Sequence, residues 1–95
     1  MVVYKMQITG NLKELIKRSF YSDKVSHKDG DFEFIQGNYM EWFSIYVKGV
    51  AFVKCYDGEL CYNLSAVGSE KDCIKYLHQI MSIYPGTRIG SPLSE

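Results

Sequence analysis

Hydrophobic and polar residues alternate at the start of the chain, between residues 2 and 8. Successive side chains of a strand point to opposite sides, so alternation places every second residue on the same face. One predicted face carries Val2, Tyr4, Met6 and Ile8, and the other carries Val3, Lys5 and Gln7. The pattern predicts a half-buried strand over residues 2–8.

A helical pattern follows, with apolar residues spaced to form one stripe: Leu12, Leu15, Ile16 and Phe20. Asn11 lies three residues before Glu14, a spacing typical of a capping box at a helix start. The sequence therefore predicts a helix from residue 12 to about residues 20–22. Residues 22–31 are polar and rich in turn-forming types, so they are predicted to form a connecting loop.

Three turn signals divide the middle of the chain into four predicted strands. Gly37-Asn38 predicts a two-residue turn that pairs Phe32 with Phe43 and Glu33 with Trp42. On that register one face gathers apolar side chains for the helices to cover, namely Phe32, Phe34, Phe43, Ile45 and Val47.

The next two turn signals set the register of the remaining strands. At Lys48-Gly49 a three-residue turn, with Gly49 in the left-handed region, keeps Ile45 beside Ala51. Asp57-Gly58 is the strongest turn signal and closes residue 56 on residue 59. It predicts a second apolar face from three pairs: Val53 with Tyr62, Ala51 with Leu64, and Cys55 with Leu60.

A second amphipathic helix is predicted after Gly68, with Ser69 as its N-cap. Its apolar stripe consists of Cys73, Ile74, Leu77, Ile80, Met81 and Tyr84. Pro85-Gly86 ends the helix, and residues 87–95 are predicted to be a frayed tail.

The predicted order is β-α-β-β-β-β-α in a single α+β domain spanning residues 1–95. We expect two layers: an antiparallel sheet of four to five strands with two helices packed on one face. The run from Phe52 to Met81, a strand, a turn glycine, a strand, a glycine and a charged helix start, resembles a repeat of the TATA-binding protein. The resemblance covers about a third of the chain, concerns topology, and implies no function.

The balance of charged residues argues against some classes of binding partner. Eleven basic residues balance eleven acidic ones, so no net field attracts nucleic acid or anionic lipid. The start of the chain lacks the pattern of a signal peptide, and no apolar run is long enough to span a bilayer. We expect a cytoplasmic, intracellular protein without a membrane partner.

Chemistry-bearing residues are sparse and scattered. The three cysteines, Cys55, Cys61 and Cys73, form no CxxC motif and are interpreted as ordinary thiols. His27 and His78 are the two histidines, and neither has a nucleophile or carboxylate at a spacing that suggests acid–base work. The sequence thus predicts no catalytic residue, no metal site and no cofactor.

The sheet face opposite the helices is predicted to be aromatic and partly basic. Building a hydrophobic core does not require such a surface. The predicted interaction face consists of Trp42, Tyr46, Phe52, Tyr56, Met40, Lys5, Lys48 and Lys54. It is expected to bind protein, either as a homodimer or with a different partner. Nucleic acid, stacked on the same aromatic rings, is the alternative, and a small enzyme is a third hypothesis. A register error of one residue would instead bury half of these side chains, and residues 22–31 or the tail would hide the face if either covered it.

Overall fold

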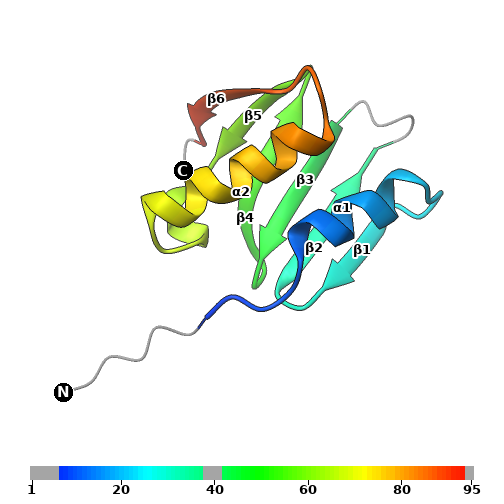
Figure 1. Cartoon of the computed structure of the whole chain (residues 1–95), viewed down its shortest axis with the longest axis horizontal. Helices are drawn as coiled ribbons and strands as arrows, with labels where there is room; N and C mark the ends of the chain where they lie inside the picture. The colour runs from blue at the N-terminus through cyan, green and yellow to red at the C-terminus, as the bar shows by residue number, and fades with distance from the viewer. Residues whose placement is uncertain (1–6, 38–41, 94–95) are drawn as a thin grey trace.

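Six strands form one mixed sheet in the computed structural model, which describes residues 7–37 and 42–93 (Figure 1). The strand order in the sheet follows the chain order. All neighbours are antiparallel except β5 and β6, which run parallel. The strands are β1 (Ser26–Asp29), β2 (Phe32–Gln36), β3 (Trp42–Val47), β4 (Val50–Tyr56), β5 (Glu59–Tyr62) and β6 (Arg88–Pro92).

Two helices, α1 (Leu12–Phe20) and α2 (Glu70–Ile83), lie on the same face of this sheet (Figure 1). Asn11 Oδ1 accepts a hydrogen bond from the Glu14 N–H at 3.2 Å, which confirms the predicted start of α1. A short 3₁₀ helix, η2 (Leu64–Ala66), joins β5 to α2. In the described ranges, no helix combines the length and apolar character that crossing a bilayer requires.

The two segments predicted to be irregular add strands to the sheet edges. Residues 26–29 were expected in a loop, but they form β1, which pairs with β2 from Ser26 opposite Ile35 to Asp29 opposite Phe32. Polar residues suit a strand here because an edge strand is open to water and is commonly charged. Residues 88–92 were expected in a frayed tail, but they form β6 beside β5. The strand predicted over residues 2–8 lies mostly outside the described residues, and Gln7 and Ile8 are not in a strand.

The register between β2 and β3 differs from the prediction. Phe32 lies opposite Val47 rather than Phe43, and Gln36 lies opposite Phe43. The Gly37 N–H donates a hydrogen bond to the Trp42 carbonyl at 3.0 Å, so the connection is longer than two residues. The pairing partners in β3 are therefore shifted by four residues from the predicted ones. A shift by an even number of residues keeps every side chain on the same face of the sheet. The predicted inward face is therefore confirmed, with exposures of 4% or less for Phe32, Phe34, Phe43, Ile45 and Val47.

The turn between β3 and β4 differs from the prediction, and a β-bulge in β4 accompanies it. Lys48-Gly49 closes as a two-residue turn with Val47 opposite Val50, and both turn residues are in the left-handed region. Ile45 lies opposite Val53 and Tyr46 opposite Ala51, so Phe52 is the extra residue. The bulge turns both Phe52 and Val53 towards the helices, and each is 0% exposed.

The hairpin around Asp57-Gly58 follows the prediction at its closed end. Tyr56 lies opposite Glu59, Cys55 opposite Leu60 and Val53 opposite Tyr62. The predicted pair of Ala51 with Leu64 does not form, because the chain leaves the sheet and enters η2 at Leu64.

The core lies between the helices and the inward face of the sheet. It contains a stack of three rings, in which Phe43 lies 5.3 Å from Phe34 and 5.0 Å from Tyr84 between ring centroids. On the α2 side, Phe32 and Phe52 both meet the ring of Tyr76 edge to face. Leu15, Ile16, Leu60, Leu77 and Ile80 also belong to this core, each at 2% exposure or less.

Candidate functional site

The sheet face opposite the helices, called here the outer face, carries four of the residues predicted to bind a partner. Trp42 and Tyr46 come from β3, and Lys54 and Tyr56 come from β4. Trp42 lies directly opposite Tyr56 across the strand pair. Trp42 is 40% exposed and Tyr56 73% exposed, so both rings present apolar area to solvent.

The remaining predicted residues of this surface fall elsewhere. The prediction that Phe52 lies on the interaction face is wrong. Phe52 belongs to the core, because the bulge turns its ring towards Tyr76 of α2. Lys48 lies in the turn at the end of β3 and is exposed. Met40 and Lys5 lie outside the described residues.

The middle of the outer face contains smaller side chains that the sequence analysis did not single out. Ser44 lies opposite Ile35 on one side and Lys54 on the other, and Lys54 in turn lies opposite Cys61. The register alone identifies this row. No sequence motif marks it, since Ser44 and Cys61 are ordinary strand residues.

Ion pairs occupy both ends of the outer face. Lys28 Nζ lies 3.9 Å from Glu33 Oε2 on the β1–β2 side, and Arg88 Nη2 lies 3.5 Å from Glu59 Oε2 on the β5–β6 side. Lys54 has no such carboxylate partner within the part of the chain that the structure describes. The charge on the outer face is therefore largely compensated, with one central lysine, Lys54, between Ser44 and Cys61.

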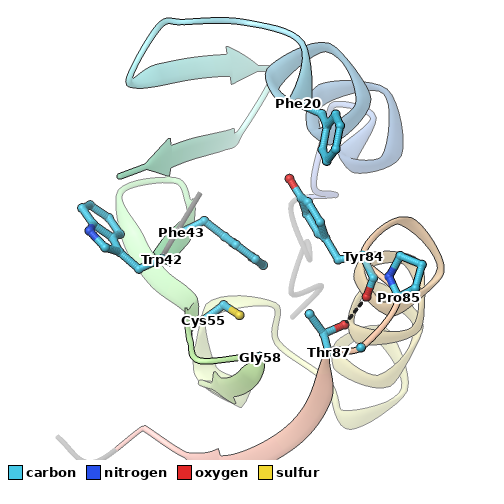
Figure 2. A pocket seen from close by; sticks show the side chains of 9 residues that line it. Phe20, Trp42, Phe43, Cys55, Gly58, Tyr84, Pro85 and Thr87 are labelled. Carbon is cyan, nitrogen blue, oxygen red and sulfur yellow. Dashed lines mark hydrogen bonds between the residues drawn. The ribbon is translucent and has the colours of Figure 1, made fainter. Parts of the chain in front are cut away.

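A second feature is a cavity at one end of the sheet, called here the end cleft (Figure 2). It has a volume of about 270 Å³ and lies where both helices end, near the start of β3 and the β4–β5 turn. Its lining residues are Phe20, Trp42, Phe43, Cys55, Gly58, Tyr84, Pro85, Gly86 and Thr87. Sequence reasoning missed this cleft because its walls come from segments far apart in the chain.

The polar side chains that line the end cleft are uncharged, and the nearby Arg88 guanidinium donates to the Asp57 carbonyl at 3.4 Å. Burial raises the pKa of the Tyr84 hydroxyl far above its ordinary value, with a smaller contribution from Cys55. Burial also raises the pKa of the Cys55 thiol. The Tyr84 hydroxyl is buried and has no hydrogen-bond partner among the described residues, while Thr87 Oγ1 donates to the Tyr84 carbonyl at 2.7 Å.

In residues 7–37 and 42–93, no three side chains of the histidine, cysteine, aspartate or glutamate type come together as a metal site. Comparisons with protein-family models, with curated proteins and with solved structures find no significant match. The class of the molecule therefore follows from its architecture: a two-layer α+β fold in which both described helices cover the same face of the sheet.

Proposed function

We propose that the chain is a small non-enzymatic protein-interaction domain that self-associates through the outer face of its sheet. The observation that carries the proposal is the Trp42–Tyr56 pair. The two residues are cross-strand partners on adjacent strands, and both side chains remain exposed on a face that neither helix covers. The Trp42 indole lies over Gly37, at the end of β2. Several exposed aromatic residues on one face are typical of interface centres, whereas single exposed rings are common on any surface.

The widening of the sheet supports an open outer face. Residues 22–31 and the tail are the segments that would close this face if they folded over it. Instead, Ser26–Asp29 and Arg88–Pro92 extend the sheet at its two edges, in the plane of the other strands (Figure 1). Both segments therefore enlarge the surface that a second copy would meet.

The charge of the chain favours a second copy as the partner. The formal net charge is zero, so two copies approach without long-range repulsion. The ion pairs lie towards the two edges of the outer face and compensate their own charges, so they do not oppose the approach of a second copy to Trp42 and Tyr56. A symmetric dimer would use the same patch twice, as two-fold interfaces do.

Single-stranded nucleic acid is the alternative ligand, favoured by Lys54 lying beside the exposed ring of Tyr56 on the same strand. Phosphate binding relies on uncompensated cations, and Lys28 and Arg88 are engaged with carboxylates. We therefore rank this alternative second.

Molar mass in solution, measured by sedimentation over a wide range of concentration and at low and high salt, tests the proposal. Self-association through apolar and aromatic area predicts a dimer that forms with rising concentration and persists at high salt. A chain that stays monomeric throughout would contradict self-association. Salt-sensitive binding of an added single-stranded oligonucleotide by that monomer would favour the alternative.

A further inference from the structure

The end cleft has walls from three elements that converge on one space. Figure 2 shows Phe20, Phe43 and Tyr84 pointing toward one another, from the end of α1, from β3 and from the residue after α2. Phe20 and Tyr84 have ring centroids 6.0 Å apart at a tilt of 41°. Aromatic rings from separate elements thus form an apolar wall around the opening.

Two glycines lie in the opposite wall, and the Arg88 guanidinium lies beside one of them, Gly58. Gly58 and Gly86 have φ angles of 78° and 96°, in a region that residues with a Cβ rarely adopt. A Cβ at Gly86 would have no heavy atom within 4 Å, so the space beside it is open. The backbone conformation that builds the two turns therefore also preserves the cleft.

The size of the cleft selects the size of its ligand. An apolar cavity of about 150 Å³ in a protein core is large enough to bind benzene. The end cleft, at about 270 Å³, is larger and is open to solvent on one side. It has room for two fused rings.

The lining favours an uncharged ligand, because the nearby Arg88 guanidinium, beside Gly58, is paired with Glu59. Among the described residues, none that lines the cleft carries a charged side chain, and burial keeps Cys55 and Tyr84 protonated at neutral pH. A quaternary ammonium group would need an open aromatic face. Phe43 and Tyr84 are stacked on each other, 5.0 Å apart at 26°, so the facing sides of these two rings are occupied.

We propose that the end cleft is a binding site for a small, uncharged, planar aromatic molecule of about two fused rings. This site is separate from the centre of the outer face, although Trp42 borders both. Indole is a suitable probe because it is neutral and bicyclic. Its charged relatives, indole-3-acetate and tryptamine, test the requirement for neutrality.

The experiment is a titration of the isotope-labelled full chain, followed by amide NMR shifts. Indole is expected to give saturable shifts at Phe43, Cys55, Gly58 and Thr87, with much weaker binding of the two charged relatives. Absence of saturable shifts there, or equal affinity for all three compounds, would overturn the proposal.

Variants separate the end cleft from the rest of the molecule. Cys55→Leu fills the cleft and is expected to weaken indole affinity by about tenfold or more, equivalent to roughly 1.4 kcal/mol. Cys61→Leu, on the adjacent strand and facing outward, is the matched control and should leave the affinity unchanged. Thr87→Leu is a second filling variant, used if Cys55→Leu fails to fold. Wild-type affinity in a folded filling variant would refute the assignment.

The Tyr56→Ala variant tests whether indole binds at the end cleft rather than on the outer face. Tyr56 does not line the end cleft, so this variant is expected to bind indole like the wild type even where it impairs self-association. Loss of indole binding in folded Tyr56→Ala would overturn the separation of the two sites.

Discussion

Phe52 of β4 meets Tyr76 of α2 edge to face, with ring centroids 6.1 Å apart and ring planes at 78°. The contact exists because Phe52 is the extra residue of the bulge, which turns its side chain towards the helices. Tyr76 also meets Phe32 at 5.3 Å, so one tyrosine links two strands that are not neighbours in the sheet.

Phe52→Ala is expected to destabilise the fold by about 3–5 kcal/mol, because it leaves a cavity in the core and removes an aromatic contact. Urea unfolding followed by circular dichroism measures the change. Val50→Ala on the same strand is the control, since Val50 is 46% exposed, and its effect should be small. Equal effects of the two substitutions would mean that Phe52 is not a core residue.

The outer-face proposal predicts a different result for Trp42→Ala. Loss of this ring should weaken dimerisation by about 2 kcal/mol or more, as for an interface anchor, and change monomer stability by about 1 kcal/mol or less. Tyr21→Ala is the matched control, because Tyr21 is 88% exposed but follows α1 on the helix side of the sheet. Sedimentation of both variants measures the effect, and equal dimerisation of Trp42→Ala and wild type would contradict the proposal.

Asp31 ties the segment before α1 to the turn between β1 and β2. Its Oδ2 accepts hydrogen bonds from the Thr9 N–H at 2.8 Å and from Thr9 Oγ1 at 3.1 Å. The Thr9 N–H lowers the pKa of the Asp31 carboxyl below its ordinary value of 3.8, because it stabilises the ionised form.

A carboxyl whose pKa is lower in the folded state stabilises the fold above its unfolded pKa, and this contribution is lost as the pH falls through the folded pKa. Asp31→Asn should therefore reduce the free energy of unfolding at neutral pH, with the difference from wild type shrinking as the solution becomes acidic. Urea unfolding at several pH values measures it. Asp23→Asn, at an exposed loop position, is the control, and a difference for Asp31→Asn that does not change with pH would contradict the assignment.

Cysteine reactivity is expected to follow exposure. Cys55 and Cys73 are 6% and 1% exposed, and burial raises the pKa of both thiols, so little thiolate forms at neutral pH. Cys61 is half-buried on the outer face and should be alkylated first, as peptide mapping by mass spectrometry would show. If the proposed dimer forms through the outer face, its labelling should slow as the protein concentration rises. Faster labelling of Cys73 would contradict the fold around α2.

Local signals made part of the fold predictable from sequence. The Asn11 cap, the Ser69 cap and the Asp57-Gly58 turn each act within a few residues, and each appears in the structure where the pattern placed it. The inward faces of β2 and β3 were also predictable, because the error in their register was even.

Non-local pairing explains what the sequence did not reveal. β6 forms because α2 returns the chain alongside β5, which is an interaction between segments about thirty positions apart, as in Glu59 opposite Arg88. The bulge at Phe52 reflects competition between a tight turn at Lys48-Gly49 and the need to bury Val53, which neither strand pattern shows alone. The end cleft depends on the same long-range packing and therefore carried no signal in the sequence.

The bulge has a consequence for the evolution of the chain by insertion and deletion. A chain lacking residue 52 would keep Tyr46 opposite Ala51 and Ile45 opposite Val53, and the strand pair would simply become regular. Trp42 would still lie opposite Tyr56. Deletion of residue 52 would therefore keep the register of the outer face but remove a fully buried ring from the core, so the bulge separates what the inner face needs from what the outer face presents.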